Sequence, residues 1–149
     1  MATIYLLNGP NLNLLGLREP HHYGHETLAT LEENARAAAK RLGFDLVARQ
    51  TNAEHQMIDW LQEARTEAAG LVLNPAAFSY HSVPVLDALK MVDCPIVEVH
   101  ITNLHRRDEE WRAHSIMSAT ATAMISGMGI HGYVLAIEHI AYLLAQKAK

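Results

Sequence analysis

TIYLLN, residues 3–8, is a short apolar run that ends at an asparagine. A run of this length and composition is typical of a strand buried on both faces of a parallel sheet. Similar runs follow at 44–50, 71–74, 95–100 and 121–126, and they alternate with segments whose apolar residues recur at helical spacing. The stretch therefore predicts an α/β fold in which it forms the first of five strands.

Helices are expected between these strands. Apolar residues at helical spacing predict helices over 28–42, which Gly43 ends, and over 57–68, which Gly70 stops. A short helix is expected over 82–92, and a closing helix over 130–144. With right-handed crossovers, this order gives one doubly wound parallel sheet covered on both faces. The chain has 149 residues, which fits a single domain, residues 1–149.

Composition excludes several classes of protein. A net charge of −4 and a pI near 6.2 argue against a nucleic-acid binder. The apolar runs are too short to span a bilayer, and residues 1–8 lack the features of a signal peptide. The single cysteine, Cys94, cannot form an internal disulfide, which fits a reducing compartment. A cytoplasmic protein without membrane or nucleic-acid partners is expected.

Polar residues follow four of the expected strands. In doubly wound sheets, ligands bind beyond the carboxyl ends of the strands, and here these ends carry Asn8, the run 49–52, Asn74 and the pair Glu98 and His100. Glu98 and His100 are two apart in a strand, so their side chains share one face. A carboxylate beside an imidazole fixes its tautomer and raises its basicity. A buried structural ion pair is the alternative interpretation.

Two loops near this edge carry further candidates. The Asn-rich loop 8–16 lacks the glycine order of a dinucleotide site and the Gly-Lys-Ser/Thr ending of a phosphate loop. The following segment, 17–24, holds Arg18 and Tyr23 and could close over a bound molecule, or it could be an ordinary surface loop. The ten histidines show no metal-ligand spacing, so no metal is expected.

Three sets of residues together resemble the type II dehydroquinase family. They are 8–16 (NGPNLNLLG) with 18–20 (REP) and 23–24 (YG), 98–103 (EVHITN) with 114–115 (HS), and 129–133 (GIHGY). The resemblance covers nearly the whole chain. It implies a flavodoxin-like sheet with strand order 2-1-3-4-5, and loss of water from 3-dehydroquinate to give 3-dehydroshikimate without a cofactor. It also implies a homododecamer built from four trimers.

The resemblance also implies catalytic roles, carried over by motif position. Tyr23 is then the base that removes the proton next to the ketone, and Arg18 supports it. Asn11 holds a water that stabilises the enolate. His100, oriented by Glu98, protonates the departing hydroxyl.

The same resemblance implies the substrate contacts. They are Asn74, Asp87 reaching in from a neighbouring subunit, Arg112, and the backbone N–H groups of Ile101 and Thr102, which receive the carboxylate. The stretch between His105 and His114 is one residue longer than the family pattern, which leaves Arg106 and Arg107 as alternatives to Arg112.

One position departs from the family pattern. The loop after Asn74 usually carries a histidine where this chain has Tyr80, and His81 stands one place later. Counting from Asn74 favours Tyr80 as the residue that faces the substrate, with His81 as the alternative.

Two other functions fit the same fold. A non-enzymatic flavodoxin-like binding or regulatory domain would not need the ionisable set formed by Arg18, Tyr23 and His100. A related lyase could act on another hydroxylated ring acid, because a fold does not choose its substrate. The closing helix carries Val134, Leu135 and Ala136 beyond its core stripe, which favours a subunit contact or a generously packed helix.

Overall fold

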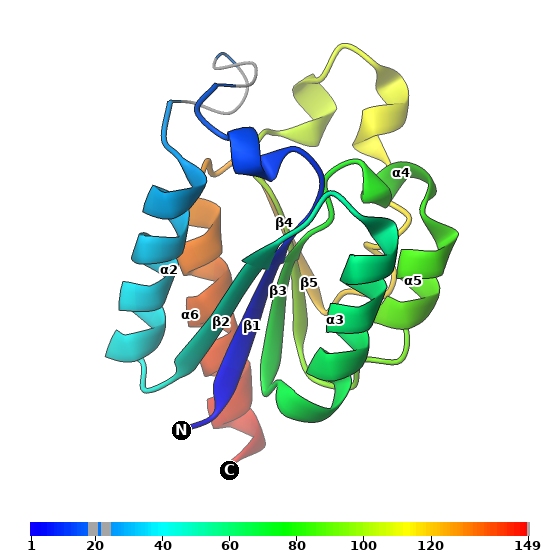
Figure 1. The fold of residues 1–149 in the computed structure, drawn as a ribbon. Helices are drawn as coiled ribbons and strands as arrows, with labels where there is room; N and C mark the ends of the chain where they lie inside the picture. Colours follow the sequence, from blue (N-terminus) through cyan, green and yellow to red (C-terminus); the bar gives the residue numbers. More distant parts are fainter. Residues whose placement is uncertain (18–20, 22–24, 149) are drawn as a thin grey trace.

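Five parallel strands form one sheet in the computed structural model, which describes residues 1–17, 21 and 25–148. The strands are β1 (Thr3–Asn8), β2 (Asp45–Gln50), β3 (Gly70–Asn74), β4 (Ile96–His100) and β5 (Ala123–Ser126). Their order across the sheet is β2-β1-β3-β4-β5 (Figure 1). The predicted parallel sheet and its strand order are therefore confirmed.

Helices cover both faces of this sheet (Figure 1). The α-helices are α2 (Leu28–Arg41), α3 (Glu54–Glu67), α4 (Phe78–His81), α5 (Val83–Leu89) and α6 (His131–Lys147). Short 3-10 turns lie at η1 (Leu12–Leu14), η2 (Leu104–Arg106) and η3 (Glu110–Ala113). Helices α2 and α6 pack on one face, and α3 and α5 on the other. None of the helices in the described part of the chain is long and apolar enough to cross a bilayer.

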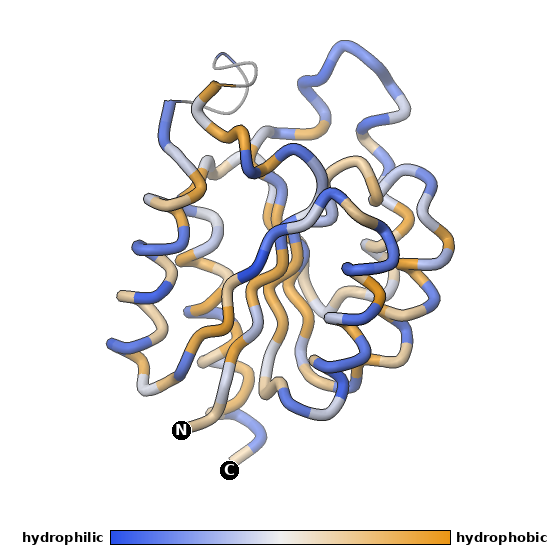
Figure 2. The backbone as a smooth tube through the Cα atoms, viewed as in Figure 1, coloured by the Kyte–Doolittle hydropathy of each residue, from blue (hydrophilic) through white to orange (hydrophobic). Residues whose placement is uncertain are grey.

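Strand β1 shows why the sheet is buried on both sides. Successive side chains of a strand point to opposite faces. Ile4 and Leu6 accordingly join the core under α2 and α6, whereas Tyr5 and Leu7 join the core under α3 and α5. Figure 2 shows the result, with apolar strands in the middle and polar residues on the outer sides of the helices. A continuous apolar run thus signals a central strand of a covered sheet.

The helix predicted over 82–92 is wrong in its bounds. Ser82 separates α4 from α5 and has a non-helical backbone, with φ −82° and ψ 88°. Its hydroxyl accepts a hydrogen bond from the N–H of Val85 at 3.3 Å, which is the contact of a helix N-cap. Pro84 lies in the first turn of α5, where its missing N–H costs little. The helix therefore spans only Val83–Leu89, and the separate short helix α4 precedes it.

A buried tyrosine joins the closing helix to the two central strands. The Tyr133 hydroxyl of α6 donates to Oδ1 of Asn8 at 2.6 Å and accepts from Nδ2 of Asn74 at 2.8 Å. Tyr133 and Asn8 are completely buried, and Asn74 is 4% exposed. Burial raises the pKa of Tyr133 far above its ordinary value, so the hydroxyl keeps its proton and can donate. The helix therefore fixes the amide groups at the ends of β1 and β3.

Replacing Tyr133 with phenylalanine tests this connection. The change keeps the ring but leaves two buried amide groups without the hydroxyl. An unsatisfied buried polar group costs about 1–3 kcal/mol, so we expect the free energy of unfolding to fall by about 2–4 kcal/mol in urea titrations. Tyr142→Phe on the exposed side of the same helix is the matched control, and it should stay within about 0.5 kcal/mol of the parent. Equal effects of the two changes would contradict the role of the Tyr133 hydroxyl.

Candidate active site

The carboxyl ends of the strands meet at one edge of the sheet because the strands are parallel and in register. Asn8 pairs laterally with Gln50 of β2 and with Asn74 of β3. A pocket lies at this edge. Its lining includes Asn11, Asn74, Tyr80, His100, Ile101, Thr102, Arg107 and Arg112. The sequence expectation of a polar site beyond the strand ends therefore corresponds to a pocket in the structure.

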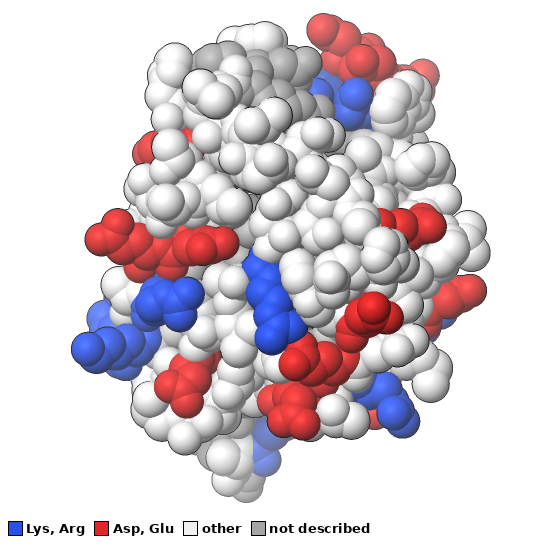
Figure 3. All heavy atoms as spheres, viewed as in Figure 1, with Lys and Arg blue, Asp and Glu red and all other residues white. Residues whose placement is uncertain are grey.

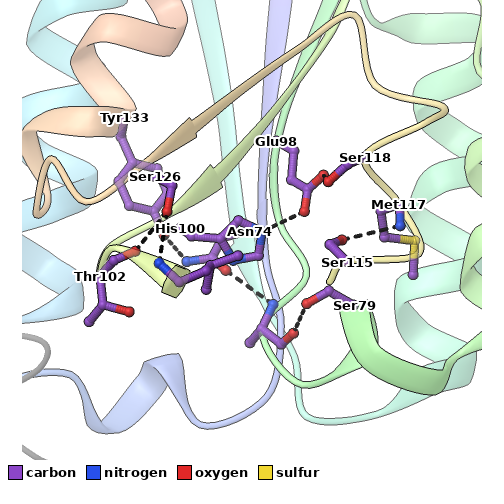
Figure 4. A network of polar contacts seen from close by, with 12 residues as sticks. Asn74, Ser79, Glu98, His100, Thr102, Ser115, Met117, Ser118, Ser126 and Tyr133 are labelled. Carbon is purple, nitrogen blue, oxygen red and sulfur yellow. Dashed lines mark hydrogen bonds and ion pairs between the residues drawn. The ribbon is translucent and has the colours of Figure 1, made fainter. Parts of the chain in front are cut away.

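Glu98 and His100 form the central pair of this site (Figure 4). Glu98 is completely buried and His100 is 4% exposed, and Oε2 of Glu98 contacts Nε2 of His100. The other carboxylate oxygen, Oε1, accepts a hydrogen bond from the Ser118 hydroxyl at 2.7 Å. A buried carboxylate is costly unless it is paired and hydrogen-bonded, and here both oxygens have partners.

The contacts of Glu98 also determine its charge. Burial by itself raises the pKa of Glu98, but the hydrogen bond and charge of His100, with hydroxyls of Ser115 and Ser118, leave the pKa below its ordinary value. An ionised carboxylate can only accept hydrogen bonds, so Nε2 of His100 carries the proton in this contact. The other ring nitrogen, Nδ1, is then the atom through which His100 can exchange a proton with a bound molecule.

Asn74 is held in one orientation at the end of β3. Its Nδ2 donates to the Tyr133 hydroxyl, and its Oδ1 accepts from the N–H of Ala76 at 3.0 Å. One amide N–H is thus engaged in the core, and the second is the donor that Asn74 can offer to the pocket. The loops after β1 and β3 also approach closely, because a Cβ atom at Gly9 would lie 2.4 Å from the carbonyl oxygen of Pro75. Only glycine permits this approach.

Tyr80, rather than His81, is among the residues that line the pocket. Its ring meets that of Trp111 edge to face at 4.9 Å between centroids. The Arg112 guanidinium lies 4.5 Å from the Trp111 ring centre and 5.6 Å from that of Tyr80, and its Nε donates to Glu109 at 3.1 Å. His81 is exposed. The structure therefore brings Tyr80 and Arg112 together at the pocket wall.

Arginines and acidic residues gather above the strand ends, over the segment that follows β4. Figure 3 shows blue side chains beside red ones at the top of the molecule. Arg112 and Arg107 both line the pocket, and Nη1 of Arg107 donates to the Thr102 hydroxyl at 3.4 Å. Arg106 is exposed and is not among the lining residues. The structure thus keeps two of the three arginines as candidates for contact with an anion.

One predicted residue lies away from this pocket, and two others lie outside the described residues. Asp87 is exposed on α5 and is not among the lining residues. Arg18 and Tyr23 lie outside the described residues, and Leu17 precedes them. The described residues contain no group of three or more His, Cys, Asp or Glu side chains that could hold a metal ion.

Sequence reasoning missed several residues of the site. Tyr133 lies in the predicted closing helix, and the structure shows that its buried hydroxyl is a polar partner of Asn74. A buried tyrosine usually finds such a partner, and that rule was the available signal. Ser118 and Trp111 lie between β4 and β5, with Trp111 in η3, and periodicity there carries no information about which side chains contact the site.

Comparisons with known proteins agree with this geometry. The dehydroquinase class II family model matches residues 2–141. The chain is similar to 3-dehydroquinate dehydratase 2 of Agrobacterium fabrum, with 47% identity over 148 residues, which cover 99% of this chain and 100% of the relative. It is also similar to the catabolic 3-dehydroquinase of Penicillium rubens, with 46% identity over 147 residues, covering 99% and 94% of the two chains.

A solved structure shows the same likeness. The type II dehydroquinase from Propionibacterium acnes superimposes with a TM-score of 0.91 and 41% sequence identity, covering 95% of this chain and 97% of that one. Family model, relatives and structure extend over nearly the full length of the chain and include the strand ends that form the pocket. The chain therefore belongs to the dehydroquinase class II family.

Proposed function

We propose that this protein is a 3-dehydroquinate dehydratase that converts 3-dehydroquinate to 3-dehydroshikimate and water. The observation that carries the proposal is His100, which lines the pocket and is paired with the buried Glu98, in a chain of the dehydroquinase class II family. An imidazole held by an ionised carboxylate is suited to protonate a departing hydroxyl. A non-enzymatic binding domain would have no use for such a pair.

The reaction proceeds through an enolate. Tyr23, as phenolate, takes the proton from the carbon next to the ketone, and the electron pair moves onto the ketone oxygen. Asn11, which lies at the pocket, holds a water that stabilises the enolate. When the enolate collapses, the C–O bond of the hydroxyl breaks and His100 supplies the proton that completes the water molecule. No step requires a metal or an organic cofactor.

The base needs help to ionise. A free tyrosine has a pKa of about 10, so only about 0.1% of it is phenolate at neutral pH. Lowering that pKa by about 3 units takes about 4 kcal/mol of preferential stabilisation of the phenolate. Arg18, five residues before Tyr23 in the same segment, supplies positive charge for this purpose.

Substrate binding uses the rest of the pocket wall. Asn74, Tyr80 and Arg112 contact the ring hydroxyls, and the Arg112 guanidinium offers paired N–H donors for this purpose. The backbone N–H groups of Ile101 and Thr102 receive the carboxylate. Tyr80 takes the substrate contact in place of His81, because Tyr80 lines the pocket and His81 does not.

The enzyme acts in the cytoplasm as a dodecamer of four trimers. The position of Asp87 is the observation in favour of this assembly. The residue is exposed on α5, outside the pocket of its own subunit, where it can complete the pocket of a neighbouring subunit. Substrate and product place the enzyme in the shikimate pathway or in quinate breakdown.

A direct assay tests the proposed function. Purified protein is mixed with 3-dehydroquinate, and the ultraviolet absorbance of the conjugated product is followed over time. The rate should survive dialysis against a strong chelator. Absence of turnover with 3-dehydroquinate, together with turnover of another hydroxylated ring acid, would replace this proposal with the related lyase.

His100→Ala and Glu98→Gln should both slow turnover, the first more severely. The alanine removes the acid itself, whereas glutamine leaves an imidazole whose orientation and charge are less well supported. General acid catalysis contributes about 10²–10⁴-fold, so we expect a loss in that range for His100→Ala and a smaller one for Glu98→Gln in steady-state kinetics. Unchanged kcat in Glu98→Gln would make the pair purely structural.

Glu98 should also affect stability in acid. Its pKa is lower in the folded protein, so its contribution is fully present above its unfolded pKa of about 4.3 and is lost as the pH falls through the lower folded value. Unfolding titrations of the parent below about pH 4.3 should therefore show a loss that Glu98→Gln shows less strongly. This measurement separates the stability of the pair from its effect on catalysis.

Tyr23→Phe should abolish nearly all turnover while substrate or product still binds. The change removes only the ionisable hydroxyl and keeps the aromatic ring. The checks are steady-state kinetics and calorimetric titration with the product. A kcat within a few-fold of the parent would remove Tyr23 from the role of base.

Tyr80→Phe should lower kcat/KM by a few-fold to about tenfold, which corresponds to the 0.5–1.5 kcal/mol of one neutral hydrogen bond. The phenylalanine keeps the ring that packs against Trp111, so the loss reports the hydroxyl. His81→Ala is the control, and it should lower kcat/KM less. If His81→Ala has the larger effect, the two assignments must be exchanged.

A further inference from the structure

The loop after β1 contains a left-handed residue at the pocket. Asn11 has φ 69° and ψ −2°, a conformation that L-residues other than glycine adopt at a cost, although asparagine tolerates it better than most. Asn11 also lines the pocket. Because the backbone conformation sets the direction of the Cα–Cβ bond, the side chain of Asn11 is aimed by whatever holds this turn in place.

Two side chains from the end of β2 hold that turn. Oδ1 of Asn52 accepts a hydrogen bond from the backbone N–H of Asn11 at 2.9 Å. Nε2 of Gln50 donates to Oδ1 of Asn52 at 3.0 Å and to the carbonyl oxygen of Gly9 at 3.1 Å. The peptide groups on both sides of Pro10 are therefore tied to one strand end, 41 residues away in the sequence.

These hydrogen bonds of Gln50 and Asn52 are separate from the pairing of the strands. The β1–β2 ladder ends at Asn8 and Gln50, and the N–H of Thr51 then donates to the carbonyl oxygen of Asn8 at 3.0 Å. The contacts to Gly9 and Asn11 lie beyond the end of that ladder. The pocket lining includes Asn11 but neither Gln50 nor Asn52. Any effect of these two side chains on the reaction therefore acts through the loop.

We propose that Gln50 and Asn52 are positioning residues that hold the backbone of Asn11 in its left-handed conformation and so aim the Asn11 side chain into the pocket. The inference rests on the proposed function, since Asn11 matters to turnover only if the enolate is stabilised there. The alternative is that these hydrogen bonds stabilise a surface turn and have no effect on turnover. The exposure of Asn52 is the observation that favours this alternative.

The conservative variant distinguishes these possibilities. Asn52→Leu removes the acceptor, and we expect kcat to fall about tenfold, with KM changed by less than about twofold. Asn52→Asp keeps an acceptor oxygen for Asn11 and Gln50, so we expect kcat within about threefold of the parent. Asn13→Ala is the matched control from the same loop, because its contact with Gln50 is long, at 3.5 Å. It should leave kcat unchanged.

A double-mutant cycle provides the readout that a structural role would not give. In an Asn11→Ala background there is no side chain left to aim, so Asn52→Leu should change kcat by less than about twofold further. Multiplicative losses in the double variant would overturn the proposal, as would an Asn52→Leu enzyme that loses thermal stability but keeps the parent kcat.

Failure of this inference is distinguishable from failure of the proposed function. If the parent protein converts 3-dehydroquinate and Asn52→Leu keeps the parent kcat, only the positioning role is wrong. If the parent protein does not convert 3-dehydroquinate at all, the proposed function fails and the positioning role fails with it.

Discussion

The lateral register of the parallel strands is the constraint on which the rest of the structure depends. Asn8 is level with both Gln50 and Asn74, so the polar ends of β1, β2 and β3 form one row. In a parallel sheet, all carboxyl ends point the same way, and every loop that follows a strand leaves from the same edge. A slip of one residue would turn Asn8 and Asn74 away from Tyr133 and point apolar side chains at its hydroxyl.

The two faces of the sheet contribute different chemistry to that edge. Asn8 and Asn74 continue the face that packs on α6, whereas Glu98 and His100 continue the face that packs on α3 and α5. The first face supplies neutral amide groups, held by a tyrosine that keeps its proton. The second supplies a carboxylate and an imidazole, and the carboxylate is satisfied by His100 and Ser118. The amide groups and the Glu98–His100 pair are thus supported by separate cores.

Strand periodicity was sufficient to predict the sheet and the pair Glu98 and His100, because it fixes which residues share a face. The order of the strands came from the resemblance to the type II dehydroquinase family. Periodicity was less informative between β4 and β5, where no repeat exists and Trp111 and Ser118 take their places through tertiary packing. The short helix α4, Phe78–His81, was also beyond periodicity, since 4 residues are too few to show a helical repeat. Tyr80 could be favoured over His81 by counting alone, and its contact with Trp111 could not be foreseen.

The hydroxyl of Tyr133 has a consequence for how the protein is made. Helix α6 follows all five strands in the chain, so a ribosome releases the ends of β1 and β3 long before their partner exists. Until then, Asn8 and Asn74 lack the partner that satisfies them in the core, and the face of the sheet that α6 covers is open to water. The amide groups at the ends of β1 and β3 therefore gain their contact with the Tyr133 hydroxyl only late in synthesis.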